Sequence, residues 1–454
     1  MSKSQAHRAG QRGRARGGRA RAGDGSCHPL LLFADDAGTI RDHPYLLAAA
    51  VDGGEATPLE EVRPIPLPRG SDLFFLPGRV PIGIDPDSRA PVALPRDERG
   101  APAHAVAAFL APAHTATHLV AAERRAEAPL LPLFSYAAVG FAGGRYWAAA
   151  RRVDPDRRQD PWRFDRARIA RRVAARRQAE PKNTLLVQLE RCALEYECRA
   201  AQNFFLDRHE APLPISTVCN ARCLGCISLQ PDGTFKAAHE RLGRPPSAAD
   251  VAAVALGHIA RVARAVVSFG QGCEGEPLLM AELLREAVRR IRDATAEGTV
   301  HLNSNASRPG LVGELAAGGL DSLRVSLNSA QRAVYEAYYR PQDYGFADVV
   351  AAIAAMRERG RFVSLNLLYF PGVTDREAEI DALGELIAAH DIGMVQLRNL
   401  NIDPEVYRAA MPAGAYGPGV GLDAFCRALR ARQPGLRFGY FNPPKEVYRA
   451  WEAS

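Results

Sequence analysis

The segment Cys219-Asn220-Ala221-Arg222-Cys223-Leu224-Gly225-Cys226 carries three cysteines at the spacing C-x3-C-x2-C. It directly follows residues 213–218, a largely apolar run that predicts a short strand. Three thiolates in one loop can surround a single soft metal centre, and thiolates are the usual ligands of iron–sulfur clusters. The spacing therefore predicts a metal centre just beyond the end of a strand.

Two kinds of metal centre use cysteines at such spacings. Zinc also binds Cys-x2-Cys, but structural zinc sites use four protein ligands. No histidine follows at the spacing of a zinc finger, and the next cysteine is the distant Cys273. A [4Fe–4S] cluster held by only three cysteines keeps one iron open for a substrate or cofactor. The isolated triplet favours this cluster, with zinc as the alternative.

A glycine-rich loop lies about one helix further along the chain. It reads Val266-Val267-Ser268-Phe269-Gly270-Gln271-Gly272-Cys273-Glu274-Gly275-Glu276-Pro277-Leu278. Glycines let a backbone approach a ligand closely and adopt positive φ angles. Taken alone, this pattern is typical of an ordinary turn between a strand and a helix. It indicates a ligand-binding loop because it lies one helix beyond the cysteine loop.

Together, these two segments resemble the radical S-adenosylmethionine (SAM) superfamily. The resemblance implies that Cys219, Cys223 and Cys226 hold three irons of a [4Fe–4S] cluster, and that SAM binds the fourth iron. A reduced cluster would then cleave SAM to a 5′-deoxyadenosyl radical that abstracts hydrogen from a substrate. Such enzymes draw electrons from a low-potential donor such as ferredoxin or flavodoxin.

The glycine-rich loop resembles the Gly-Gly-Glu-Pro segment that follows the second barrel strand in this superfamily. The resemblance implies that backbone groups around Gly275 and the carboxylate of Glu276 hold the methionyl ammonium group of SAM. Glu274 stands where the familiar form has another glycine.

Residues 301–306 and 323–328 resemble the ends of the third and fourth strands of the superfamily. The residues that they offer for the carboxylate and ribose of SAM are Ser304, Asn305, Ser326 and Asn328. Asn328 replaces the more usual aspartate. Gly225 replaces the aromatic residue that many relatives place near adenine, so that contact must be missing or come from elsewhere.

Strand-like and helix-like runs alternate between residues 208 and 401, which predicts parallel βαβ units. The predicted strands start near Pro214, Val266, Val300, Leu323, Phe362 and Met394. The predicted helices lie at 248–264, 280–294, 309–317, 347–359 and 376–390. This α/β pattern matches the partial (β/α)6, TIM-like barrel that the resemblance implies. The motifs follow predicted strands, where α/β folds bind ligands.

Other segments flank the barrel. Residues 28–150 contain short apolar runs between Pro and Gly, which predicts a β-rich α+β domain of unknown role with a helix near 105–110. Residues 151–207 predict a helical connector with a basic helix at 166–177. Residues 402–454 predict a C-terminal extension with a helix near 422–432. This extension lacks the Cys-rich auxiliary-cluster region of many peptide-modifying relatives.

Three further cysteines raise the hypothesis of a second metal centre formed by Cys192, Cys198 and Cys273. Cys192 and Cys198 are six residues apart and would not share one face of an unbroken helix, so the chain must bend between them. The alternative is that these are buried thiols without a metal, because free cysteine is often buried as a small hydrophobe.

The net charge of +7 is concentrated at the start of the chain of 454 residues. Residues 1–25 hold seven basic residues and one acidic residue, so the rest of the chain is close to neutral. The segment 1–27 is predicted to be a disordered Gly/Arg tail. Nucleic acid could bind this tail, but a solvated extension is favoured. No apolar run of about 20 residues and no secretory signal are evident, so a cytoplasmic protein without membrane contact is expected.

The sequence leaves the substrate open. About two hundred residues precede the barrel, which favours a peptide, a protein or another sizeable molecule as the substrate. The basic tail and basic helix motivate RNA modification as an alternative. A non-catalytic module that binds a metal or nucleic acid is the alternative from another class.

Overall fold

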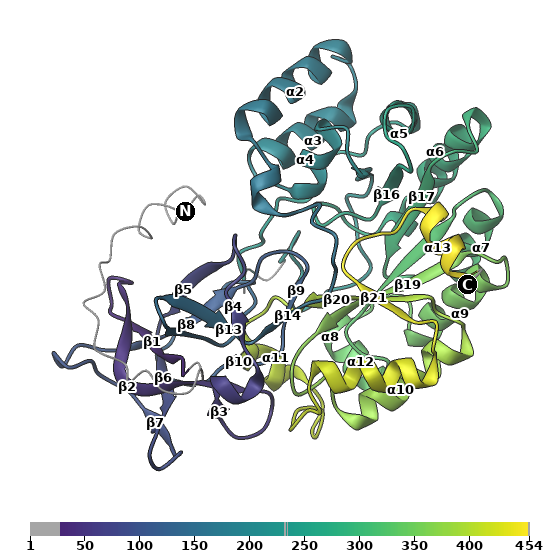
Figure 1. Ribbon diagram of the computed structural model, residues 1–454. Helices are drawn as coiled ribbons and strands as arrows, with labels where there is room; N and C mark the ends of the chain where they lie inside the picture. The colour runs from purple at the N-terminus through teal and green to yellow at the C-terminus, as the bar shows by residue number, and fades with distance from the viewer. Residues whose placement is uncertain (1–27, 231–232, 234, 453–454) are drawn as a thin grey trace.

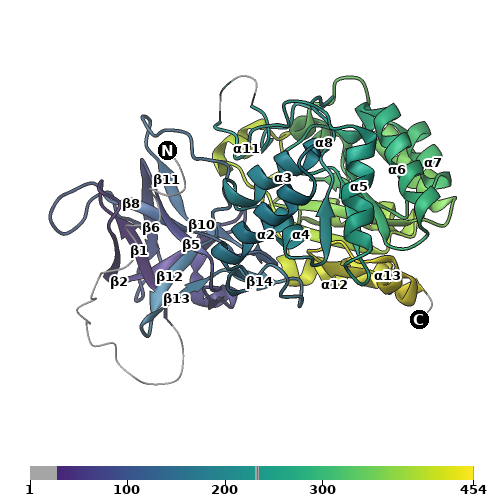
Figure 2. The same ribbon diagram turned by 90° about the horizontal axis from the view of Figure 1, so that it is seen from above.

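The computed structural model describes residues 28–230, 233 and 235–452, and the predicted tail at 1–27 lies outside them. A β-rich part built from the first third of the chain adjoins a larger α/β part (Figure 1). Three helices, α2 (Arg166–Ala179), α3 (Thr184–Leu194) and α4 (Arg199–Phe205), connect the two parts (Figure 2). Within the described residues, no helix combines the length and apolarity that crossing a membrane requires.

The α/β part is organised around one sheet of seven strands. In spatial order, the strands are β15 (Glu210–Pro212), β16 (Val266–Phe269), β17 (Thr299–Ser304), β18 (Ser322–Leu327), β19 (Phe362–Tyr369), β20 (Met394–Asn399) and β21 (Arg437–Gly439). All neighbouring pairs are parallel, which confirms the predicted βαβ pattern. The sheet curls without closing, because its two outer strands each pair on one side only (Figure 1).

The first and last strands differ from the sequence prediction. The strand predicted at 213–218 is wrong, because β15 ends at Pro212. The amides of Ile215 and Ser216 donate instead to the buried carboxylate of Glu274, at 2.7 and 2.9 Å, so they are not free to join a sheet. The seventh strand, β21, was not predicted because three residues carry too little pattern.

Helices cover the outer face of the sheet (Figure 2). They are α5 (Ala248–Ile259), α6 (Ala281–Ala294), α7 (Pro309–Ala317), α8 (Arg332–Tyr339), α9 (Phe346–Arg357) and α10 (Glu377–Ala389). Of the later helices, α12 (Leu422–Arg432) packs against α10, and α11 (Pro404–Ala410) contacts α8. The buried residues of such a helix recur at the helical period, so one face packs on the sheet and the other is exposed. In α6, Leu284, Val288 and Ile291 are buried, whereas Arg289 and Arg290 are exposed. The short helices α8 and α11 were not predicted.

The N-terminal part is β-rich, as predicted, and its strands pair antiparallel. Its strands are β1 (Leu30–Ala34), β2 (Ile40–Val51), β3 (Thr57–Pro58), β4 (Ile65–Pro66), β5 (Asp72–Leu76), β6 (Arg79–Ile84), β7 (Pro91–Ala93), β8 (His104–Phe109), β10 (Leu119–Val120), β11 (Ala122–Arg124), β12 (Val139–Ala142) and β13 (Arg145–Ala148). The helix predicted near 105–110 is wrong, because these residues form β8. Its small alanines are buried between β1 and β5, where tertiary packing overrides their helix propensity.

The N-terminal part docks against the strand β20 of the barrel. The docking element is a pair of short strands, β9 (His114–Ala116) and β14 (Ala150–Arg152). The side chain of Asn399 on β20 accepts a hydrogen bond from the amide of Ala116 at 2.8 Å, and donates to the carbonyl of His114 at 3.0 Å. The N-terminal part is thereby placed at the carboxyl ends of the barrel strands.

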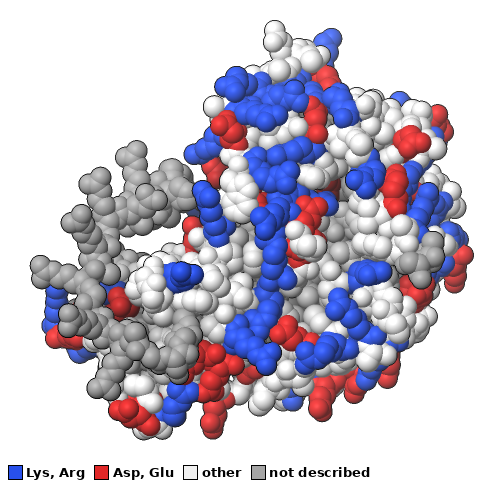
Figure 3. Space-filling model, in the orientation of Figure 1, with Lys and Arg blue, Asp and Glu red and all other residues white. Residues whose placement is uncertain are grey.

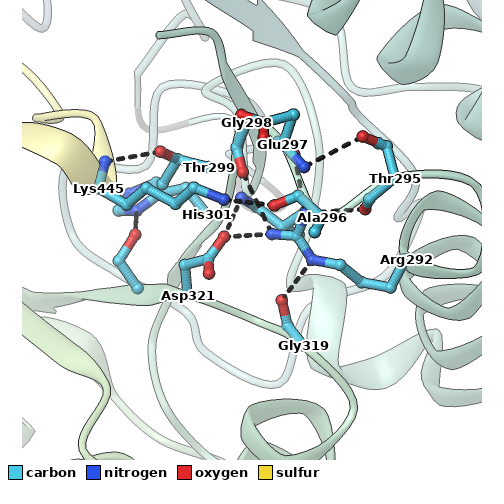
Figure 4. Close-up of polar contacts among 12 residues, drawn as sticks. Arg292, Thr295, Ala296, Glu297, Gly298, Thr299, His301, Gly319, Asp321 and Lys445 are labelled. Carbon is cyan, nitrogen blue, oxygen red and sulfur yellow. Dashed lines mark hydrogen bonds and ion pairs between the residues drawn. The ribbon is translucent and has the colours of Figure 1, made fainter.

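The last residues of the chain cross beneath the barrel. Asn442 donates to Glu210 at the start of β15 and accepts from Gln396 on β20, each at 3.0 Å. The amide of Lys445, which begins α13 (Lys445–Glu452), donates to the hydroxyl of Thr299 at 2.7 Å. Figure 4 shows this contact at the amino end of β17, beside the ion pair of Arg292 with Asp321. The amino ends of the strands are thus closed, and their carboxyl ends face a cavity.

Candidate metal and cofactor site

A cavity of about 470 Å³ lies at the carboxyl ends of the barrel strands. It is lined by nearly all of the residues that the sequence proposed for the core site: Cys219, Cys223, Cys226, Gly275, Glu276, Ser304, Asn305 and Ser326. Phe109 and Leu110 of the N-terminal part form a further piece of its wall. The structure therefore brings residues from four loops and strands, spread over more than one hundred positions, to one place.

The cysteine loop is held by backbone contacts with the end of α8. The amides of Arg222 and Leu224 donate to the carbonyls of Tyr339 and Tyr338, both at 3.0 Å. A hydrogen bond of 3.2 Å from the amide of Cys226 to the carbonyl of Cys223 folds the loop tightly. These bonds satisfy a backbone that has no regular secondary structure of its own.

Glu274 ties the cysteine loop to the glycine-rich loop. Its carboxylate accepts the amides of Ile215, Ser216 and Gln271, which explains why a glutamate stands where the superfamily motif usually has a glycine. Burial raises the pKa of Glu274 to about 8, and the hydrogen bonds from the backbone amides act in the opposite direction.

Gly275 lies against the strand-like segment before Cys219. Its amide donates to Ser216 at 2.8 Å, and the amide of Glu276 donates to Val218 at 2.7 Å. A Cβ atom on Gly275 would stand 1.9 Å from the carbonyl oxygen of Val218, a distance that no side chain can occupy. The close approach of the two loops requires glycine here.

The carboxylate of Glu276 is nearly buried and faces the third strand. It accepts hydrogen bonds from the hydroxyl of Ser304 at 2.6 Å and from the amide of Asn305 at 2.8 Å. Burial raises the pKa of Glu276, which these two hydrogen bonds partly offset. The structure thus joins three predicted site residues in one polar network at the cavity.

Asn328 does not line this cavity. Its side-chain amide donates to the carbonyl of Val334 and to the hydroxyl of Tyr407, both at 3.2 Å. The ribose contact proposed for Asn328 therefore stays a prediction that the cavity does not support. Ser326, two residues earlier on the same strand, does line the cavity.

One segment of the chain matches the model of a known protein family. The model of the radical SAM superfamily matches residues 213–383, which hold the cysteine loop, the glycine-rich loop and the next strands. Residues 213–383 of this chain therefore form a radical SAM domain. No curated protein matches its sequence.

The chain is similar to several solved structures over part of its length. A radical SAM methyltransferase from Sphaerobacter thermophilus is 19% identical with a TM-score of 0.38, and the match covers 51% of this chain and 66% of that chain. SuiB of Streptococcus suis bound to S-adenosylmethionine is 13% identical with a TM-score of 0.35, covering 51% of each chain. A spore photoproduct lyase variant is 16% identical with a TM-score of 0.37, covering 57% of this chain and 95% of that chain.

The radical SAM family implies a [4Fe–4S] cluster and SAM, and the donor set at the cavity fits both. Three thiols of one loop line the cavity, and the carboxylate of Glu276 lies across from them. Burial raises the pKa of the thiol of Cys219, and the nearby cation of Arg241 acts to lower it. No three His, Cys, Asp or Glu side chains of the described ranges converge closely enough to hold one metal ion, so the fit rests on donor type and position.

Cys192, Cys198 and Cys273 are not among any group of metal-binding side chains in the described residues, so the structure gives no support to a second metal centre. The thiols of Cys192 and Cys273 lie close enough to shift each other's pKa, and the amide of Cys198 donates to the carbonyl of Cys192 at 2.9 Å. The chain bends between α3 and α4, as a shared site would require. Without a metal-binding group among the residues described here, the contact of two buried thiols is the simpler account.

Sequence reasoning missed several residues of the radical SAM cavity. Tyr338 of α8 fills the space beside Gly225, because a Cβ on Gly225 would lie 3.1 Å from the hydroxyl of Tyr338. Tyr338 also lines the cavity. Arg324 of β18 and Arg398 of β20 also line the cavity. A charged residue within an otherwise apolar barrel strand was the signal for both arginines.

Proposed function

We propose that this protein is a radical SAM enzyme that cleaves SAM reductively and transfers the resulting radical to a substrate in the barrel cavity. The observation that carries the proposal is the meeting of the cysteine triplet with Gly275, Glu276 and Ser304 at one cavity. When bound, the reduced [4Fe–4S] cluster would supply an electron that splits SAM into methionine and a 5′-deoxyadenosyl radical, which abstracts hydrogen from the substrate.

The residues of this chain would bind and orient the cofactors. Cys219, Cys223 and Cys226 would hold three irons, which leaves the fourth for the amino and carboxylate groups of SAM. The carboxylate of Glu276 would accept the methionyl ammonium group in a charge-assisted hydrogen bond. Phe109 and Leu110 would exclude water from the radical, since they bring apolar surface to the wall of the cavity.

The proposal extends to the class of substrate and to the electron donor. A peptide, a protein or another sizeable molecule stays the favoured class, and a low-potential donor such as ferredoxin or flavodoxin would supply the electron. A cytoplasmic location is part of the same proposal.

The basic helix gives little support to RNA modification. Figure 3 shows basic side chains over α2 and along the middle of this face. On α2, however, Arg172 and Arg176 are paired with Asp207, and Arg177 is paired with Glu190. Asp207 is also paired with Arg261, so these acidic neighbours neutralise only part of the charge of α2 and reduce what it offers to RNA phosphates.

The test is anaerobic reconstitution with iron and sulfide, followed by reduction with dithionite in the presence of SAM. The wild-type protein should form 5′-deoxyadenosine and methionine. The variant with Cys219→Ala, Cys223→Ala and Cys226→Ala should form neither and should retain almost no iron. Cys426→Ala is the matched control, because Cys426 lies on α12 and does not line the cavity. Undiminished cleavage in the triple variant would disprove the proposal.

A further inference from the structure

Two arginines face the barrel cavity from strands that are not neighbours. Arg324 lies in the middle of β18, and Arg398 lies near the end of β20. Asn366 of the intervening strand β19 lines the same cavity. Side chains alternate between the two faces of a strand, so these three residues mark the inner face of three adjacent strands.

Neither guanidinium group has a carboxylate partner among the described residues. Arg324 donates to the side-chain carbonyl of Gln396 at 2.7 Å, and Arg398 donates to the backbone carbonyl of Tyr440 at 2.6 Å. The Nε atoms of both arginines are buried without a hydrogen-bond partner. An arginine carries five N–H donors, so most of the donors of this pair are left for a group in the cavity.

The arrangement is unfavourable unless a negative charge joins it. Burial together with the positive charge of Arg398 lowers the pKa of Arg324 to about 9, and the carboxylate of Glu210, which is not paired with it, opposes this shift only in part. Arg79, in contrast, is neutralised by Asp403 and Glu405. Unpaired buried charge is costly, so a pair of like charges at a cavity indicates an anionic ligand.

The position of the pair separates it from the residues assigned to SAM. Glu276, Ser304 and Asn305 gather at the carboxyl ends of β16 and β17. Arg324 lies lower in the barrel, bonded to Gln396, which itself is held by Asn442 of the segment beneath the barrel. Arg398 stands two strands away from Arg324, with its guanidinium 3.5 Å from the centre of the Tyr440 ring.

We propose that Arg324 and Arg398 bind an oxyanion of the substrate, a carboxylate or a phosphate, and so hold the substrate at the floor of the cavity. The proposal rests on the proposed function, since it assigns the substrate end of the same cavity. Arginine suits this role because its planar fork binds both oxyanions through paired hydrogen bonds. The ring of Tyr440 would keep the fork of Arg398 oriented.

The test measures anion binding to the reconstituted, SAM-loaded protein by calorimetry, with inorganic phosphate and succinate as separate probes. At least one probe should bind with a dissociation constant below about 10 mM, and the tighter probe identifies the oxyanion. Arg324→Gln and Arg398→Gln should each weaken that binding by about ten-fold or more, because a charge-assisted pair is lost. Arg427→Gln, on the exposed face of α12, is the matched control and should bind like the wild type.

A parallel titration with SAM distinguishes the two sources of a carboxylate. If the arginines hold the substrate, the dissociation constant of SAM should stay within about two-fold in both variants. An equal loss of SAM binding would assign the arginines to the carboxylate of SAM and overturn the proposal. Absence of probe binding below about 50 mM, or equal binding by the variants, would also overturn it. None of these results depends on cleavage of SAM, so failure here and failure of the proposed function are separable.

Discussion

Gly275 and Val218 approach each other so closely that a Cβ atom on the glycine would stand 1.9 Å from the valine carbonyl oxygen. This contact joins the loop after the second strand to the residue before Cys219. Beside it, the backbone amides of Gly275 and Glu276 donate to the carbonyls of Ser216 and Val218. The position of the cysteine loop at the cavity therefore depends on the absence of one side chain.

Gly275→Ala should destabilise this junction and displace the cysteine loop. The added methyl group meets backbone atoms, which cannot rotate away, so we expect a loss of several kcal/mol in the free energy of unfolding. Iron content after reconstitution should fall with it. Chemical denaturation and iron analysis of the purified variant measure both effects.

Gly310→Ala is the matched control for this substitution. Gly310 lies in the first turn of α7, and a Cβ there would meet no heavy atom within 4 Å. Alanine in a helix should leave stability unchanged or raise it by about 0.5–1 kcal/mol. A variant of Gly275 that matches this control in stability and iron content would contradict the steric argument.

Glu276→Gln tests the contact with the methionyl ammonium group. The amide keeps the size of the carboxylate but lacks its charge, so SAM should bind about ten-fold more weakly while iron content stays near normal. Equilibrium dialysis with SAM measures this change, and Glu282→Gln on the exposed start of α6 is the control. Unchanged SAM binding in the Glu276 variant would move the ammonium site elsewhere.

The sequence predicted those parts of the site that depend on short-range spacing. The cysteine triplet, the Gly275-Glu276 pair and Ser304 each belong to a local pattern, and all of them line the cavity. The alternation of strands and helices was equally visible, because each element carries its own period of buried residues.

Features that depend on distant partners were not predictable. Glu274 has no role until Ile215 and Ser216, about sixty positions earlier, reach its carboxylate. The arginine pair exists only because the barrel brings β18 and β20 to one cavity. The alanines of β8 imply a helix in isolation, and burial between two strands decides otherwise.

Glu379 should make the stability of the protein depend on pH. Its carboxylate is buried on α10 and bonded to the amide of Ala330 and the side chain of Gln331, at 2.7 and 2.8 Å. Burial raises its pKa from 4.5 to about 7, so between these values the folded state binds a proton more tightly than the unfolded state. The stabilising contribution of the protonated form is therefore complete below about pH 4.5 and is lost as the pH rises through 7, with a total of about 3 kcal/mol.

Glu379→Gln should remove this dependence, because the amide does not titrate. Melting temperatures of the wild type and the variant, measured in steps between pH 5 and pH 8, should differ in slope, with the wild type falling more steeply. Glu377→Gln, at the exposed start of the same helix, should keep the wild-type slope. Parallel curves for wild type and Glu379→Gln would show that the carboxylate is already ionised throughout this range.

Arg79→Met should loosen the attachment of the N-terminal part to the barrel. Arg79 is 1% exposed and donates to Asp403 at 2.9 Å and to Glu405 at 2.8 Å, so methionine would leave the buried carboxylate of Asp403 without its cation. Breaking a buried pair from one side costs about 3–5 kcal/mol, whereas a surface pair contributes about 0–1 kcal/mol.

Arg285→Met, which removes the surface pair with Glu314, is the control. Urea denaturation should show the large loss for Arg79→Met alone. Equal losses in the two variants would mean that the buried pair does not hold the two parts together, and that the wall formed by Phe109 and Leu110 is positioned by the contacts of β9 with β20 instead.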